Sequence, residues 1–166
     1  MNNRNLWLWA TLLAALAVAG LIFHFSAQPA EESSAVSAEI VEPVLHALYT
    51  DFDAMPVGRQ TSLRDRVTFI VRKLAHFSIY ALLGLCLAAH TRLRRPDWPD
   101  RTAALTAWAA VAAYAGTDEV HQIFVQGRSA ELRDLGIDAA GALCGVLLVA
   151  LLCRLRRRMQ DKKSGV

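Results

Sequence analysis

Carboxylates and a histidine stand at the end of an apolar stretch of this chain. The run 118–122, DEVHQ, closes the apolar segment 102–120, and Asp134 and Asp138 stand at the start of the apolar segment 135–153. Ionisable groups are expensive at membrane depth, so a functional site is the first interpretation of such a cluster. The groups could bind a ligand, exchange protons or only brace neighbouring helices.

Three polar stripes are expected to meet at one depth. On a helix that turns 100° per residue, Lys73, His76 and Tyr80 fall within about 60° of arc. Asp134 shares a similar arc with small residues that should face another helix, so its carboxylate should point into a bundle. The third stripe lies within 114–122, with Glu119 turned away by one residue. The candidate pocket comprises Lys73, His76, Tyr80, Asp118, Glu119, Gln122, Arg128, Asp134 and Asp138.

The cations and carboxylates of this pocket should pair with one another, because an unpaired charge at such depth would be neutralised instead. Lys73 or Arg128 is expected beside Asp118, Asp134 or Asp138. Arg128 follows a glycine in a loop, and its planar fork suits two-point binding of a phosphate or carboxylate. An ion pair with Asp134 is the equal alternative for this arginine.

Several chemical roles stay open at this stage. His76 could bond to a neighbouring helix, contact a ligand or transfer protons, and Asp118 with Glu119 could form a solvated helix end instead of a site. No catalytic residue is assigned, because neither Ser78 nor Ser129 has a GxSxG context. A metal site from the histidines and acids of the pocket lacks a spacing such as HExxH, so we expect no metal and no cofactor.

The composition predicts an all-α integral membrane protein with one domain over residues 1–166. Of these residues 54% are hydrophobic, and four segments approach the roughly 20 residues that cross a hydrocarbon core of about 30 Å. The first segment either stays in the membrane or is cleaved as a signal peptide. The cysteines 86, 144 and 153 lie within apolar segments and are interpreted as small buried residues. The predicted transmembrane helices are 6–25, 74–90, 102–120 and 135–153.

The basic residues predict the topology. They gather in three groups, which a four-span chain places on one side, and the positive-inside rule makes that side cytoplasmic. We therefore expect a multi-pass protein of the bacterial plasma membrane with both termini and the basic tail 154–166 in the cytoplasm. The basic residues adjoin apolar helices instead of forming a soluble basic face, which excludes a nucleic-acid partner. The groups are Arg4; Arg92, Arg94, Arg95 and Arg101; and Arg154, Arg156, Arg157, Arg158, Lys162 and Lys163.

The segment 26–72 is expected outside the membrane. Residues 26–34 indicate an exit loop, and from Val36 apolar residues recur every four positions, which predicts an external amphipathic helix. That helix either lies on the outer interface or packs over the mouth of the bundle. Ser62 and Asp65 resemble a capping box at the start of a second external helix that runs into the segment 74–90. Close helix packing is expected at Gly84, Gly116, Gly141 and Gly145.

The segments 72–84 (RKLAHFSIYALLG), 118–124 (DEVHQIF), 127–128 and 134–145 resemble the VanZ-like family, and the resemblance covers nearly all of the chain except the basic tail. The family often has proline before the Gly-Arg pair, where this chain has Gln126. The resemblance implies a small integral membrane protein, which in the name-giving member is associated with reduced susceptibility to teicoplanin-type lipoglycopeptides. The positions that match the family pattern are Lys73, His76, Phe77, Tyr80, Asp118, Glu119, Gln122, Phe124, Arg128, Asp134, Asp138, Gly141 and Gly145.

Three functional hypotheses follow. The preferred one is a non-enzymatic cell-envelope protein that binds a lipid-linked cell-wall precursor or a lipid head group in the outward pocket, and that contributes to lipoglycopeptide resistance. The alternative is a membrane-embedded hydrolase or transferase that acts on lipid-linked phosphates. A transporter or flippase is disfavoured, because the sequence has neither a broken helix nor an inverted repeat. The lipid bilayer is the expected partner in every case.

Overall fold

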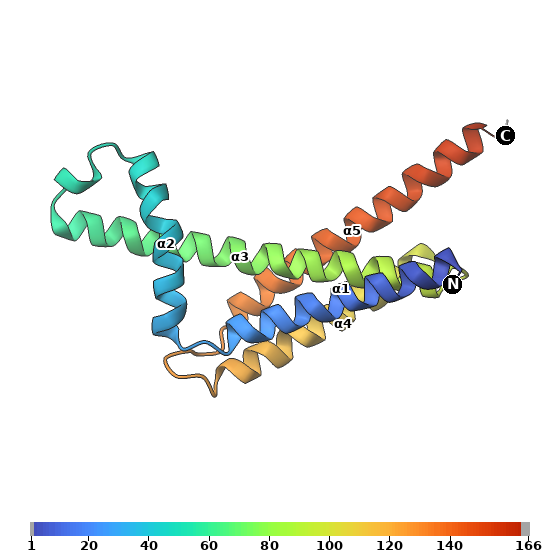
Figure 1. Cartoon of the computed structure of the whole chain (residues 1–166), viewed down its shortest axis with the longest axis horizontal. Coiled ribbons are helices and arrows are strands. Elements are labelled where there is room, and N and C mark those ends of the chain that lie inside the picture. The colour runs from blue at the N-terminus through green and yellow to red at the C-terminus, as the bar shows by residue number, and fades with distance from the viewer. Residues whose placement is uncertain (1, 164–166) are drawn as a thin grey trace.

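The chain folds into helices joined by short connections. The computed structural model describes residues 2–163, and this part contains no strand, which confirms the all-α expectation. Figure 1 shows α2 crossing one end of a bundle that the other α-helices build. The elements are α1 (Asn3–Ser26), α2 (Ala30–Leu48), the 3-10 turn η1 (Phe52–Ala54), α3 (Val57–Arg94), α4 (Asp100–Gln122) and α5 (Leu132–Lys163).

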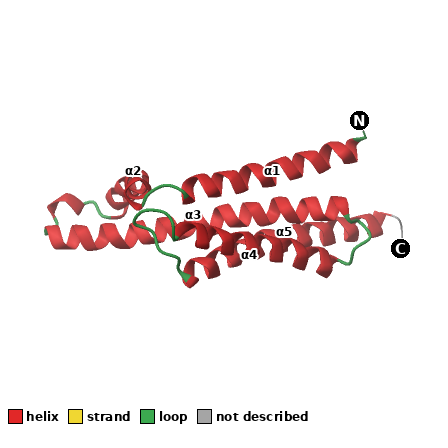
Figure 2. Cartoon of the chain, turned by 90° about the horizontal axis from the view of Figure 1, so that it is seen from below, coloured by secondary structure: helices red, strands yellow, loops and turns green. Residues whose placement is uncertain are grey.

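Three helices are long and apolar enough to cross a membrane. They are α1, α3 and α5, and they contain the predicted spans 6–25, 74–90 and 135–153. The fourth predicted span, 102–120, lies in α4, whose commonest residue is alanine, a weaker hydrophobe than the leucine and valine of the other helices. α4 nevertheless packs against α3 and α5 within the bundle (Figure 2). Four membrane crossings therefore stay a prediction.

Glycines set the distance between α3 and α5, which share the most extensive contact of the bundle. A Cβ atom at Gly145 would overlap the backbone carbonyl oxygen of Ala81. Gly84 and Gly141 also lie against the backbone of the opposite helix. The two backbones can approach this closely only because these positions carry no side chain.

Gly116 differs from the expectation of close packing. A Cβ atom built there would meet no atom within 4 Å. The buried stripe of α4 runs instead through Val111, Ala115 and Asp118, and one residue of helix turns Gly116 by 100° away from that stripe. A small residue within an apolar helix therefore does not by itself identify a contact.

The two aromatic residues Tyr114 and Trp108 fasten α4 to its neighbours. The Tyr114 hydroxyl donates to the carbonyl of Ala19 in α1 at 2.7 Å, and the Trp108 indole donates to the carbonyl of Ala139 in α5 at 3.0 Å. Both side chains bury an apolar body while their polar atoms find a partner. Around them, Val18, Tyr80 and other buried residues form the main core.

Beyond the bundle, α2 crosses α3, and the turn that contains η1 leads back to the first turns of α3 (Figure 1). Val41, Leu45 and Phe52 are buried between these two segments. α2 begins at Ala30, so the prediction of a loop over 26–34 is wrong in its second half; the acidic first turn of α2, Glu31 and Glu32, favours a helix start there because of the helix dipole.

α3 begins at Val57, directly after Pro56, and continues without a break to Arg94. Ser62 and Asp65 therefore lie inside this helix, and the predicted capping box is wrong. Proline is well tolerated at a helix start, because the N–H that it lacks would have no partner within the helix. Pro56 therefore marks the start of α3, ahead of Ser62.

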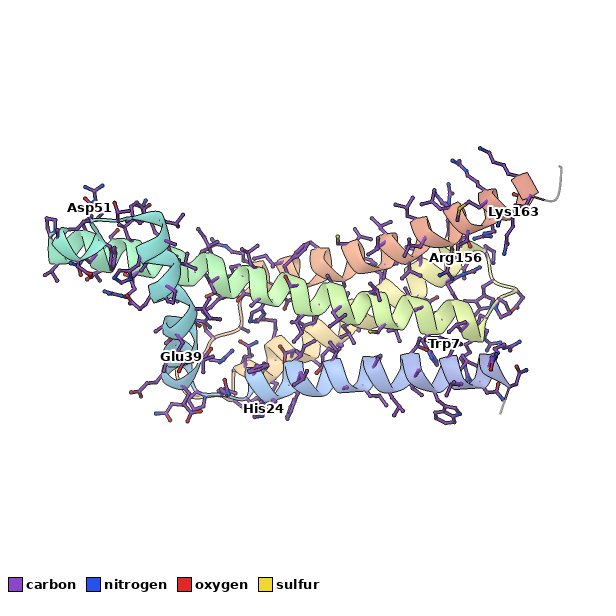
Figure 3. The ribbon with its side chains drawn as sticks, turned by 45° about the horizontal axis from the view of Figure 1, so that its top comes forward. Trp7, His24, Glu39, Asp51, Arg156 and Lys163 are labelled. Atoms are coloured by element: carbon purple, nitrogen blue, oxygen red, sulfur yellow. The ribbon has the colours of Figure 1, made fainter. Side chains whose placement is uncertain are left out.

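The two ends of the molecule differ in charge (Figure 3). Trp7, Arg156 and Lys163 lie toward one end, whereas Glu39 and Asp51 lie toward the other. At the basic end, α3, α4 and α5 are linked by ion pairs of Asp100 with Arg92 at 3.3 Å and with Arg157. The candidate pocket belongs to the opposite end, next to α2.

Candidate functional site

The predicted pocket residues come from the halves of α3, α4 and α5 that adjoin α2 and from the loop 123–131. Their contacts form four groups. There is an ion pair, a histidine beside a carboxylate, and a carboxylate that accepts hydrogen bonds from a tyrosine and an amide. The last group is two side chains that form hydrogen bonds with backbone atoms. The polar stripes inferred from helical spacing thus face one another across the bundle. Their individual partners decide what each one can do.

Lys73 of α3 forms an ion pair with Asp134 at the start of α5. Their side chains are 19% and 17% exposed, so water screens the pair only partly. Asp134 also lies in the first turn of its helix, where a negative charge is favourable. Of the pairings that the sequence left open, the lysine therefore takes the outermost carboxylate.

His76 and Asp138 form the second pair, one turn deeper. The His76 Nδ1 and Asp138 Oδ1 atoms are 3.3 Å apart, and the carboxylate is fully buried. Their alignment leaves both Nδ1 and the carboxylate oxygens without a hydrogen bond within the described chain. The other imidazole nitrogen, Nε2, takes no part in this pair and can bind a different partner. His76 also lines a cavity beside α1 and α2.

Asp118 joins α3 to α4 and also lines that cavity. One carboxylate oxygen accepts hydrogen bonds from the Tyr80 hydroxyl and from the Gln122 amide, each at 3.3 Å. The other oxygen is buried and has no partner among residues 2–163. Asp118 is thus a buried acceptor inside the protein, which contradicts the alternative of a solvated helix end for this residue.

Glu119 is buried too, although the helical spacing turned it away from the Asp118 stripe. One of its carboxylate oxygens accepts a hydrogen bond at 2.8 Å from the backbone N–H of Glu131. Glu119 therefore braces the end of the loop 123–131 against α4. The helical projection did not include that loop, which covers a face of α4 that would otherwise be exposed.

Arg128 joins the loop 123–131 to the backbone at the end of α1, which is far away in the sequence. Its Nε atom donates to the carbonyl of Gln28 at 2.9 Å, and Nη2 donates to the carbonyl of Phe25 at 3.0 Å. The preceding Gly127 has a φ of 74°, a conformation that favours glycine. The alternative of an ion pair with Asp134 is not realised, because Lys73 occupies that carboxylate.

Arg72 is the site residue that the sequence analysis missed. It stands one position before Lys73 on α3, and within residues 2–163 it makes neither a hydrogen bond nor an ion pair. Burial, followed by the like charge of Arg72, lowers the pKa of Arg128 from its usual range. A pair of adjacent cations at the edge of a carboxylate-rich cluster is the sequence signal that could have identified it.

Two cavities adjoin these residues. The first has a volume of about 240 Å³, lies between α1, α2 and α3, and has a predominantly apolar wall. The second has a volume of about 250 Å³, lies between α3, α4 and the loop 123–131, and has a largely polar wall. Arg72 and Arg128 line both cavities. Within the described residues, no three His, Cys, Asp or Glu side chains are placed to hold a metal ion.

A bundle with three helices of membrane length and a polar site at one end defines a small helical membrane protein. The family model described as VanZ/LLP1 matches residues 11–153, so the chain belongs to the VanZ/LLP1 family. The comparisons with curated proteins and with solved structures gave no match.

Proposed function

We propose that this protein is an integral protein of the bacterial plasma membrane whose outward cavity binds the anionic head group of an envelope lipid. A lipid-linked cell-wall precursor and a phospholipid both carry such a group. The observation that supports this proposal is the position of Arg72 and Arg128 in the wall of the polar cavity, with no carboxylate of residues 2–163 paired to either. Two guanidinium groups that form no ion pair within residues 2–163 attract an anion.

Arg128 retains binding capacity in this arrangement. Three of its five N–H donors reach oxygen atoms of Phe25, Gln28 and Gln122, and all three acceptors are neutral. Its charge is therefore held in place without being neutralised. A fixed, partly buried cation loses little entropy when an anion binds to it, which favours a binding role.

The proposed topology has four membrane crossings with both termini in the cytoplasm. The basic residues near Arg156 and Lys163 lie at the end of the molecule opposite to Glu39, as expected if they face the cytoplasm (Figure 3). α2 then lies at the outer interface, where its exposed Ile40 and Leu48 contact lipid. The arginine pair is thereby placed near the depth of the lipid head groups.

Within the family context, we further propose that the protein contributes to reduced susceptibility to lipoglycopeptides such as teicoplanin. Expression in a sensitive bacterium should raise the inhibitory concentration, and Arg72→Gln should remove about tenfold or more of head-group affinity and with it most of the increase. Arg72 has no hydrogen-bond or ion-pair partner among residues 2–163, so its loss breaks no polar contact there. Arg59→Gln is the matched control, at the exposed start of the same helix. Equal protection by both variants would contradict the proposal.

A second candidate is a hydrolase or transferase that acts on lipid phosphates, and the pair of His76 with the buried Asp138 favours it. A nearby carboxylate stabilises the imidazolium that forms when the other imidazole nitrogen accepts a proton from an attacking water. Purified protein in nanodiscs would then release phosphate from a lipid phosphate, and His76→Gln would reduce the rate about 100-fold or more. No turnover, with or without divalent metal, would rule out this candidate.

A further inference from the structure

Among residues 2–163, only Arg72 and Arg128 line both the apolar and the polar cavity. Every other lining residue belongs to one cavity alone. The two guanidinium groups therefore lie at a boundary, with a predominantly apolar space on one side and a largely polar space on the other. A ligand held by both arginines would meet both spaces.

The apolar cavity suits a hydrocarbon chain. Its wall includes Ile22 of α1, Val36 and Ile40 of α2, and Val71 and Ile79 of α3. Polar atoms contribute little to that wall, and water gains few hydrogen bonds in such a space. Val36 and Ile40 are also about half exposed, at 49% and 54%, so the cavity continues into an apolar surface.

The charges of the polar cavity specify how much negative charge fits. Arg72, Lys73 and Arg128 line it together with Glu131 and Asp134, so the polar cavity by itself has an excess of one positive charge, while the Asp118 carboxylate lines the apolar cavity beside the same two arginines. A phosphodiester carries one negative charge at neutral pH and balances this excess. A pyrophosphate carries more, and a head group with an additional ammonium cancels the charge that attracts it.

The remaining wall of the polar cavity specifies the rest of the head group. Thr68, Gln122 and Ser129 offer uncharged donors and acceptors beside the charged residues. Hydroxyl groups can bond to all of these side chains without changing the charge balance. The space on this side of the arginines therefore favours a head group that carries hydroxyls.

We propose that a single phosphodiester lipid with a hydroxyl-bearing head group occupies both cavities. Its phosphate lies between Arg72 and Arg128, one hydrocarbon chain enters the apolar cavity, and the head group enters the polar cavity. This inference rests on the proposed function, and it replaces a general anionic lipid with one chemical class. Enclosure of the chain by the apolar wall adds van der Waals packing to the affinity, because in a membrane or a micelle the chain is already out of water.

Binding to the full-length protein in a neutral detergent tests the inference with four probes. Phosphatidylglycerol has the expected charge, head group and chains; phosphatidylethanolamine lacks the net charge; glycerophosphoglycerol lacks the chains; and farnesyl pyrophosphate carries excess charge. We expect phosphatidylglycerol to bind at least about tenfold more tightly than each of the other probes, as measured by native mass spectrometry. Equal or tighter binding of any other probe would overturn the inference.

Two variants separate this inference from the proposed function. Ile40→Glu places a charge in the apolar wall and should weaken phosphatidylglycerol about tenfold or more while leaving glycerophosphoglycerol unchanged. Leu48→Glu makes the same change on the same helix at a position that is 64% exposed and lines neither cavity, and it should bind like the native protein. Arg72→Gln should weaken both probes.

The outcomes are distinct. If both probes bind equally and both depend on Arg72, anion binding stands and the two-cavity lipid is wrong. If Arg72→Gln weakens the binding of no anionic probe, the proposed function itself is wrong. Thermal unfolding of each variant identifies any loss of binding that comes from misfolding. If Ile40→Glu misfolds, Ala75→Phe replaces it in the test, because the larger side chain fills the same cavity without adding charge.

Discussion

Replacing Gly145 by alanine is expected to destabilise the bundle by about 1–3 kcal/mol. The added methyl group would overlap the carbonyl oxygen of Ala81, which belongs to the backbone and cannot rotate away as a side chain would. α3 and α5 must therefore separate, and their contact is the most extensive in the molecule. The intrinsic preference of alanine for helices, worth about 1 kcal/mol over glycine, opposes this effect and does not outweigh it.

Gly116→Ala is the matched control for this substitution. It makes the same chemical change within a helix, at a position where a Cβ atom meets nothing within 4 Å. We expect its stability to equal or slightly exceed that of the native protein. Unfolding by sodium dodecyl sulfate, followed by far-ultraviolet circular dichroism, measures both variants. If Gly145→Ala is as stable as Gly116→Ala, the close contact of α3 with α5 is wrong.

Lys73→Met is expected to cost about 2 kcal/mol of stability, because it leaves the carboxylate of Asp134 without its cation. Loss of one partner from a fully buried ion pair costs about 3–5 kcal/mol. The present pair is roughly one-fifth exposed, so screening by water reduces the effect. The methionine keeps much of the apolar length of the lysine, which limits the loss of packing.

The double variant Lys73→Met/Asp134→Leu distinguishes the pair from the individual side chains. Removal of both charges leaves no unpaired carboxylate, so most of the lost stability should return. The same unfolding measurement on the two single variants and the double variant gives the coupling energy. Additive losses in this cycle would mean that the two charges do not interact in the folded protein.

Helical periodicity was sufficient to predict which polar residues of the helices face one another. Lys73, His76 and Tyr80 share one face of α3, and their partners Asp134, Asp138 and Asp118 lie on the two helices that this face contacts. The prediction succeeded because each stripe depends only on the local geometry of a helix. Which cation pairs with which carboxylate depends on helix register, and the sequence left that open.

Partners in the connections could not be predicted in this way. Glu119 bonds to the backbone of Glu131, and Arg128 bonds to backbone carbonyls at Phe25 and Gln28. Backbone groups are present at every residue, so no residue type in the sequence identifies these acceptors. The start of α2 was missed for a related reason, because residues 26–34 contain the proline and serines typical of a loop, although a helix begins within them at Ala30.

The hydrogen bonds of Arg128 also affect the order of assembly. They join residues that are 100 and 103 positions apart, and the backbone N–H of Ala30 donates to the carbonyl of Gln126 at 3.1 Å in the same region. Closing a connection of this length is entropically unfavourable until the intervening helices have packed. During biosynthesis these hydrogen bonds cannot form until the loop 123–131 has been made. The cavity wall is therefore completed late, and a truncated chain that ends before this loop would have helices but no site.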